Sequence, residues 1–327
     1  MRTSLISCLC LLLCVIASPA CGQDEEGARV EPKRSTFDAS LPSKLEVRRT
    51  TTGHLLVKAN LNGKDAGWWI LDTGAGMSCI EKEVADQVKL PDAGAITAKG
   101  MGGEKQTKLR TFDSLTVGGV KLEEGKLLEL NLKPYGFLMG AGVPIAGIIG
   151  HDCFMAGVFD IDMANATVSV HDPKSFKLAP SQGEWSTVTL VGRRPAVEGK
   201  IENSETGMLL LDTGSNDGLL VHSPTVQKLK LLDDRKTSKS VNGGVGGMKS
   251  VRTGKLKSVT LGGAEITDVP ASFAEAKDGL TASDEVLATA GLKFLRNFRM
   301  VINQSANQIA FSRTTGATTK ATTSPSK

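Results

Sequence analysis

The 327-residue sequence contains one segment twice, and this duplication constrains its fold more than any other feature. The tripeptide Asp-Thr-Gly occurs at Asp72 and again at Asp212, each time directly after a run of apolar residues. Aligning the two aspartates matches the upstream segments without a gap, and the downstream segments match after four extra residues in the second copy. Self-similarity of this length indicates a duplicated structural unit. We place the copies at residues 53–172 and 188–313.

Two further pairs of segments match between the copies. The first pair is glycine-rich and consists of Gly100, Met101, Gly102 and Gly103 against Gly244, Val245, Gly246 and Gly247. The second pair is an apolar run that ends in glycine, at Gly150 in the first copy and at Gly291 in the second. The second copy has only Thr289 and Ala290 before its glycine, so we expect thinner support for its Asp loop.

The pattern of each copy predicts strands and turns rather than long helices. The chain holds 36 glycines, and residues 57–60 and 68–71 look like strands joined at the hairpin signal Asn62-Gly63. Short helices are expected over residues 82–88 and after Gly150. The predicted fold is mostly β, with two lobes related by a pseudo-two-fold axis that brings their Asp-Thr-Gly loops together.

The amino terminus reads as a targeting segment. Arg2, an apolar stretch and a small-residue cleavage site predict a signal peptide over residues 1–20, with residues 1–22 as the alternative. The apolar stretch is too short to span a bilayer. We therefore expect an exported protein, periplasmic or secreted. Cys21 stands where a lipoprotein would carry its lipid, although Ser18 departs from that signal, so a lipid anchor is the alternative.

Three mostly polar segments lie outside the copies. Residues 23–44 are charged and are expected to form a loose linker or a pro-segment. Residues 173–187 form a polar connector with two prolines. Residues 314–327 lack large apolar side chains and are predicted to be a disordered tail.

Charge and cysteine content narrow the classes of function. The net charge of +4 comes from scattered basic residues, which argues against a nucleic-acid partner. Four of the six cysteines lie in or beside the leader. The folded part keeps only Cys79 and Cys153, which can form one bridge or stay as small buried side chains. These two and four histidines are too few and too scattered for a zinc site, so we expect no metal and no organic cofactor. His54, His171 and His222 look like surface residues.

Two Asp-Thr-Gly loops that meet would have a definite chemistry. Neighbouring carboxyls share one proton because both cannot ionise cheaply, so the pair holds a general base beside a general acid. Such a pair can deprotonate a water and protonate the carbonyl under attack. The remaining loop residues would support the pair: Thr73 and Thr213 by bonds between the loops, Gly74 and Gly214 by close approach, and Ala75 and Ser215 by their side chains. The Ser215 hydroxyl would stabilise ionised Asp212 and leave the proton on Asp72.

The duplicated Asp motif, the glycine-rich hairpins and the later apolar-apolar-glycine together resemble the retropepsin-like aspartic peptidases, in a form that carries both lobes in one chain. The resemblance covers residues 53–313 and implies closed-barrel lobes with a peptide cleft between them. It implies that the glycine-rich segments are flaps over the substrate. It also places Cys79 close to Cys153, and we predict a disulfide between them.

From these features we expect a monomeric aspartic endopeptidase that uses Asp72 and Asp212 on a peptide or protein substrate. The alternative is a catalytically silent pseudo-peptidase of the cell envelope that binds peptides through the same cleft. A β-rich structural lipoprotein with chance motifs is a third interpretation. His151 and Asp152 beside Cys153 could suggest a cysteine nucleophile, but a buried thiol fits the predicted packing face better.

Overall fold

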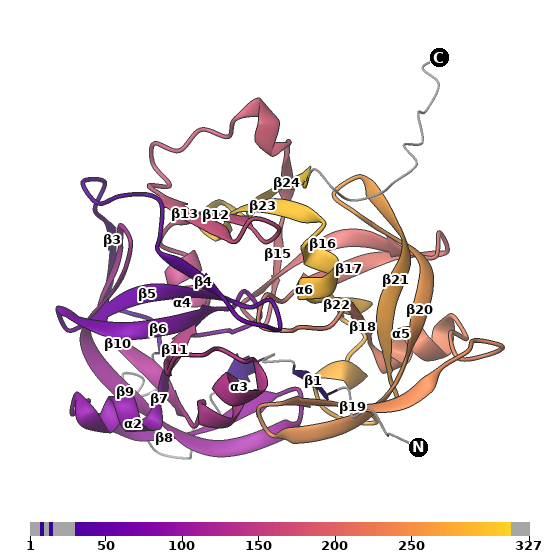
Figure 1. Cartoon of the computed structure of the whole chain (residues 1–327), viewed down its shortest axis with the longest axis horizontal. Helices are drawn as coiled ribbons and strands as arrows, with labels where there is room; N and C mark the ends of the chain where they lie inside the picture. Colours follow the sequence, from indigo (N-terminus) through magenta and orange to yellow (C-terminus); the bar gives the residue numbers. More distant parts are fainter. Residues whose placement is uncertain (1–6, 10–12, 16–29, 315–327) are drawn as a thin grey trace.

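The computed structural model describes residues 30–314 and, for the backbone alone, the strands β1 (Ser7–Leu9) and β2 (Leu13–Val15). The structure is mostly β, and its strands form three sheets. Figure 1 shows the first repeat in indigo to magenta beside the second repeat in salmon pink through orange to yellow. Among the described residues no helix is long and apolar enough to cross a membrane. The signal-peptide, lipidation and tail predictions lie outside the described residues, apart from those two short strands.

The first repeat builds a sheet in the order β2-β8-β9-β10-β7-β11-β6-β5-β4, and β5 also pairs with β9. The sheet therefore returns on itself through β5. Its strands are β4 (Val47–Arg49), β5 (Leu55–Leu61), β6 (Lys64–Leu71), β7 (Cys79–Glu81), β8 (Asp92–Gly100), β9 (Gly103–Val117), β10 (Val120–Leu130) and β11 (Ile145–Ile149), with helices α2 (Lys82–Gln87), α3 (Lys133–Leu138) and α4 (His151–Phe154).

The second repeat builds the same arrangement in the order β1-β19-β20-β21-β18-β22-β17-β16-β15, and β16 also pairs with β20. The equivalent strands thus occupy equivalent places in both sheets. They are β15 (Thr189–Val191), β16 (Arg194–Ile201), β17 (Glu205–Leu211), β18 (Leu219–Val221), β19 (Ser238–Gly244), β20 (Gly247–Leu261), β21 (Ala264–Ala274) and β22 (Ala288–Ala290), with helices α5 (Ser223–Lys228) and α6 (Leu292–Leu295) and the 3-10 turn η2 (Leu280–Ala282).

A third sheet joins the repeats in the order β13-β12-β23-β24-β14 and lies at the top of Figure 1. The first repeat supplies β12 (Val158–Asp162) and β13 (Thr167–His171), and the second supplies β23 (Phe298–Asn303) and β24 (Gln308–Arg313), with the turn η3 (Gln304–Ala306) between them. The connector contributes η1 (Pro180–Gln182) and β14 (Trp185–Thr187). The core continues from one repeat into the other through this sheet, since one apolar cluster holds both Phe159 and Phe298.

Local sequence signals predicted the repeated elements. The expected strands at residues 57–60 and 68–71 lie within β5 and β6, and the helix expected at residues 82–88 is α2. β5 and β6 turn at Asn62 and Gly63, both of which have positive φ, the conformation that these two residue types tolerate best.

The expectation of a loose segment over residues 23–44 is wrong in its described part. Strand β3 (Arg34–Phe37) pairs antiparallel with β10. Phe37 packs on Gly119, where an added Cβ would lie 2.5 Å from the phenyl ring. The missing side chain at Gly119 makes room for the ring, and this apolar contact holds a segment whose composition is mostly polar.

Candidate active site

Both Asp-Thr-Gly loops begin where a buried strand ends. Strand β6 leads into Asp72 and strand β17 into Asp212, and both aspartates have an exposed fraction of 0%. The loops turn on equivalent bonds, since the Gly74 amide donates to Asp72 Oδ1 at 2.7 Å and the Gly214 amide to Asp212 Oδ1 at 2.9 Å. Each carboxyl is thus oriented by its own loop despite the cost of burying it.

The two loops hold each other through their threonines. The Thr73 amide donates to Thr213 Oγ1 at 3.0 Å, and the Thr213 amide donates to Thr73 Oγ1 at 3.1 Å. Each hydroxyl in turn donates across the interface, Thr73 Oγ1 to the Leu211 carbonyl and Thr213 Oγ1 to the Leu71 carbonyl, both at 2.8 Å. Reciprocal bonds of this kind are the pattern that a pseudo-two-fold axis between the loops produces.

The hydrogen bonds between the two Asp-Thr-Gly loops bring the two carboxyls together. The Gly214 amide also donates to Asp72 Oδ1, at 3.1 Å, so one donor serves both aspartates. A Cβ on Gly74 would lie 2.5 Å from Asp212 Cγ, and a Cβ on Gly214 would lie 2.2 Å from Asp72 Oδ2. Only glycine lets each loop approach the opposite carboxyl this closely.

The environment favours a proton on the pair. Burial raises the pKa of Asp72 well above its usual range, and the nearby Asp212 carboxylate raises it further, against smaller opposing effects of the Gly74 and Gly214 amides. Asp72 Oδ2 is buried and has no hydrogen-bond partner among the described residues. This oxygen is therefore suited to carry the proton and to meet a reactant.

The apolar-apolar-glycine segments anchor the loops in the same way in both repeats. The Asp72 amide donates to the Ile149 carbonyl and the Asp212 amide to the Ala290 carbonyl, both at 3.0 Å. The Ala75 carbonyl accepts the first amide of α4 at 3.0 Å, and the Ser215 carbonyl accepts the first amide of α6 at 2.7 Å. The smaller side chains at Thr289 and Ala290 therefore do not weaken the backbone support of the second loop. The Ser215 hydroxyl accepts the Asp217 amide at 3.3 Å.

The glycine-rich segments are the tips of two long hairpins that contact each other. The Gly102 amide at the tip of β8–β9 donates a hydrogen bond of 2.9 Å to the Val245 carbonyl at the tip of β19–β20. Val245 packs in an apolar cluster of the first repeat, and Met101 packs in one of the second repeat. Each tip thus anchors one apolar side chain in the opposite repeat.

His54 was missed, and its predicted surface position is wrong. It is fully buried just before β5, and its Nε2 lies 3.0 Å from the Gly214 carbonyl of the opposite Asp loop. Burial lowers its pKa to about 4, so the neutral ring donates from Nε2 and accepts from Thr52 Oγ1 through Nδ1 at 2.8 Å. The sequence did hold a signal for a buried ionisable residue at this position. His54 directly precedes the apolar run of β5, and the second copy also has an ionisable residue, Arg194, at the matching position.

His222 is also buried rather than exposed, with Nε2 3.1 Å from Thr289 Oγ1. Burial lowers its pKa to about 4. His171 is partly buried.

The predicted disulfide is not formed, because Cys79 and Cys153 are both free and buried. Cys79 belongs to the same apolar cluster as Ile148, and Cys153 belongs to the cluster that holds Ile149. Neighbouring residues of a strand face opposite sides of its sheet, so the two thiols lie on opposite faces of β11. Burial raises the pKa of both thiols, which fits packing rather than nucleophilic roles.

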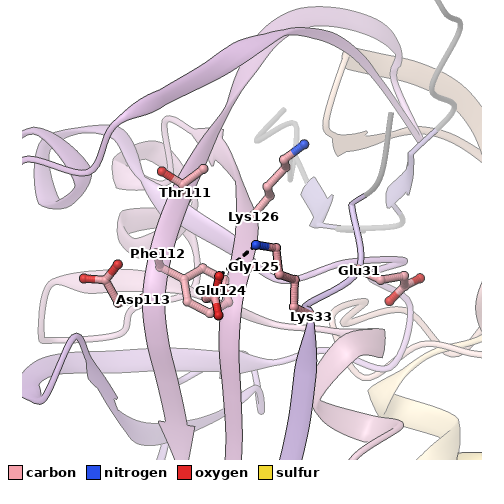
Figure 2. Close-up of a pocket in the computed structure, with 8 residues that line it drawn as sticks. All are labelled: Glu31, Lys33, Thr111, Phe112, Asp113, Glu124, Gly125 and Lys126. Carbon is pink, nitrogen blue, oxygen red and sulfur yellow. Dashed lines mark hydrogen bonds and ion pairs between the residues drawn. The ribbon is translucent and has the colours of Figure 1, made fainter. Parts of the chain in front are cut away.

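A surface pocket of about 330 Å³ lies over β9 and β10, away from the Asp loops (Figure 2). A Lys33–Glu124 ion pair of 2.9 Å crosses it. It contains none of the residues that the sequence singled out, and its charges are mixed. Its lining residues are Glu31, Lys33, Thr111, Phe112, Asp113, Glu124, Gly125 and Lys126.

Two repeats that each contribute one Asp-Thr-Gly loop and one glycine-tipped hairpin define a duplicated, two-lobed protease-like fold. The family model described as "Aspartyl protease" matches the chain twice, at residues 57–153 and 197–289. These two regions cover more than half of the chain, and the chain belongs to this family in a duplicated, retropepsin-like form. No curated protein matches the chain.

Proposed function

We propose that the protein is an aspartic endopeptidase in which Asp72 and Asp212 activate a water for peptide-bond hydrolysis. One observation carries the proposal: the two loops cross so closely that the Gly214 amide donates to both carboxyls. The interlocking threonines hold that geometry without any contribution from the substrate. A protein that only bound peptides would not need two paired, buried carboxyls.

The proposed reaction needs one shared proton. Asp212, ionised, takes a proton from the water as its oxygen attacks the peptide carbonyl, while protonated Asp72 donates its proton to the carbonyl oxygen. The tetrahedral intermediate then collapses: the C–N bond breaks, the leaving amine takes the proton from Asp212, and Asp72 recovers its own from the hydroxyl. The raised pKa of Asp72 supports this assignment, although the two carboxyls titrate as a pair.

The remaining residues have supporting roles in the proposal. Each sheet that returns on itself is a closed-barrel lobe, with the first lobe at residues 53–172 and the second at 188–313. The two hairpin tips are flaps that separate to admit an extended peptide and then close over it. We further propose a monomer exported by its amino-terminal segment, with a lipid on Cys21 as the alternative to a soluble form.

The test is cleavage of a mixed peptide library from pH 3 to 8, read by mass spectrometry. Asp72→Asn and Asp212→Asn are each expected to lower the rate at least about 100-fold, the usual size of a lost acid–base group. The rate of the unchanged protein should fall as the pH rises through the pKa of Asp72, because the shared proton is then lost.

Asp284→Asn is the matched control, since Asp284 is exposed on the surface. It should cleave like the unchanged protein. If peptides bind tightly but stay intact at every pH, the result would contradict the peptidase proposal and favour a catalytically silent peptide-binding protein.

A further inference from the structure

The two repeats differ in the wall between the Asp loop and the flap strand. In the second repeat this wall is polar, since Asn242 Nδ2 donates to Asp217 Oδ2 at 3.2 Å. The repeat alignment places Met77 and Ala98 at the same positions in the first repeat. Met77 and Ala98 are fully buried in the apolar cluster that also holds Ala75 and Ile148. This wall is therefore polar in the second repeat and apolar in the first.

The polar pair has an unused acceptor. Asp217 Oδ1 accepts the Gly218 amide at 2.8 Å, so both oxygens of this carboxylate are engaged. Because the Asp217 carboxylate accepts, the Asn242 amide nitrogen must face it, and Asn242 Oδ1 is left over. Asn242 has an exposed fraction of 0%, so water does not reach this oxygen. The oxygen also has no hydrogen-bond partner among the described residues. A buried acceptor without a partner is costly, and a donor from a ligand would remove the cost.

The amino-terminal strands show that extended segments can pair with the flap strands of both repeats. Strand β1 (Ser7–Leu9) takes the free edge of β19, and strand β2 (Leu13–Val15) takes the free edge of β8. Figure 1 shows β1 beside β19. β1 is parallel to its partner with Cys8 opposite Asn242, whereas β2 is antiparallel with Val15 opposite Ala98.

This combination fixes the direction of a bound peptide. Flap strands related by a two-fold axis between them run in opposite directions, so one peptide across both is parallel to one and antiparallel to the other. The earlier strand, β1, lies on the second repeat. The amino-terminal side of a peptide bound in this way therefore faces Asn242 and Asp217, and its carboxyl-terminal side faces Ala98 and Met77.

We propose that the cleft selects peptides by this asymmetry. It takes a side chain that donates hydrogen bonds on the amino-terminal side of the cleaved bond and an apolar side chain on the carboxyl-terminal side. Asn242 and Asp217 determine the first preference, and Met77 and Ala98 determine the second. This specificity rests on the proposed peptidase function and extends it to a class of substrate.

The test uses three apolar peptides that differ at two positions seven residues apart, the spacing of Cys8 and Val15. One has leucine at both positions, one has glutamine at the first, and one has glutamine at the second. Glutamine donates at every pH, so the result is independent of charge. We expect the amino-terminal glutamine peptide to be cut with a kcat/KM about tenfold above that of the carboxyl-terminal one, a ratio typical of one or two hydrogen bonds in a desolvated site.

The double variant Asp217→Met with Asn242→Ala replaces the polar pair of the second repeat with the apolar residues that the first repeat has at the matching positions. Its ratio between the two glutamine peptides should fall to about one, and this ratio is independent of the variant's overall activity. Equal rates for the two glutamine peptides with the unchanged protein would overturn the inference even if the variant fails to fold. Failure to cut any of the three peptides or the mixed library would instead overturn the proposed function, so the two failures are distinguishable.

Discussion

At the scale of single residues, the Asp loops depend on groups that transfer no proton. Each threonine hydroxyl accepts the amide of the other loop and donates to a carbonyl of the other repeat. Both groups are buried, so water cannot replace a lost partner. In the proposed peptidase, the hydroxyls would therefore affect catalysis through the spacing of the two carboxyls.

Thr73→Val keeps the shape of the side chain and removes the hydroxyl. It leaves the Thr213 amide and the Leu211 carbonyl without a partner, which should lower the free energy of unfolding by about 2 kcal/mol. Urea unfolding and kcat/KM on a cleaved peptide measure the two effects. Thr73→Ser retains the hydroxyl and should recover most of both. Equal losses in the serine and valine variants would show that the methyl group matters rather than the hydroxyl.

At the scale of elements, the hairpins β8–β9 and β19–β20 meet at glycines where backbone lies against backbone. A Cβ on Gly102 would lie 2.1 Å from the Gly247 nitrogen. No side-chain movement relieves a contact with backbone, so the tips must separate to accept a larger residue.

Gly102→Ala should therefore impair closure and lower kcat/KM about tenfold or more, which corresponds to ~1.4 kcal/mol of transition-state stabilisation. Gly243→Ala is the matched control in the neighbouring hairpin, because its Cβ would meet only Met248 Cγ at 3.8 Å. Steady-state kinetics with one peptide measure both variants. Equal rates for the two variants would contradict a role for contact between the tips.

The amino-terminal strands use the same strand edges that a peptide substrate would use. A chain that keeps residues 1–29 should thus cleave peptides more slowly than a chain that begins at Val30, because a tethered segment competes at high effective concentration. The comparison is of initial rates at low substrate concentration. Leu9→Pro with Leu13→Pro removes backbone donors from both strands and should return the longer chain to the faster rate. Identical rates for all three chains would contradict this competition.

Sequence reasoning reached the elements whose signals are local. Asp-Thr-Gly after an apolar run located both loops, and paired glycines located both hairpin tips. It did not reach features decided by partners distant in sequence. Phe37 orders β3 only because Gly119 leaves room for its ring, and His54 is buried only because the opposite loop presents the Gly214 carbonyl. The same holds for Cys79, whose face of the sheet could not be assigned before the register of β7 against β11 was known.

At the scale of the whole molecule, the structure buries histidines in their neutral form. Burial lowers the pKa of His54, His151 and His222 to about 4 from the ordinary 6.5. The unfolded chain binds protons at these residues below about pH 6.5, whereas the folded chain does not until about pH 4. Stability therefore falls as the pH falls through this window. Burial raises the pKa of Asp72 and of Asp152, and these two carboxyls act in the opposite direction. They stand against four histidines, since burial also lowers the pKa of His171.

We expect the free energy of unfolding to decrease between pH 7 and pH 5. Each buried histidine can contribute ~3 kcal/mol over its full titration, and only part of that contribution is lost within this range. Urea unfolding followed by tryptophan fluorescence measures it. His222→Gln keeps a group that can bond to Thr289 but does not titrate, so it should make the dependence on pH shallower. A free energy of unfolding that stays constant over this range in the unchanged protein would contradict the assignment of neutral buried histidines.

The sheet β13-β12-β23-β24-β14 gives the duplication a mechanical consequence. Its β12–β23 pairing joins strands from different repeats, and β14 of the connector forms one edge by pairing with β24. A single cut in the chain between η1 and β13 would leave every one of these ladders in place. The two halves would then remain associated without a covalent link, as the subunits of a dimer do.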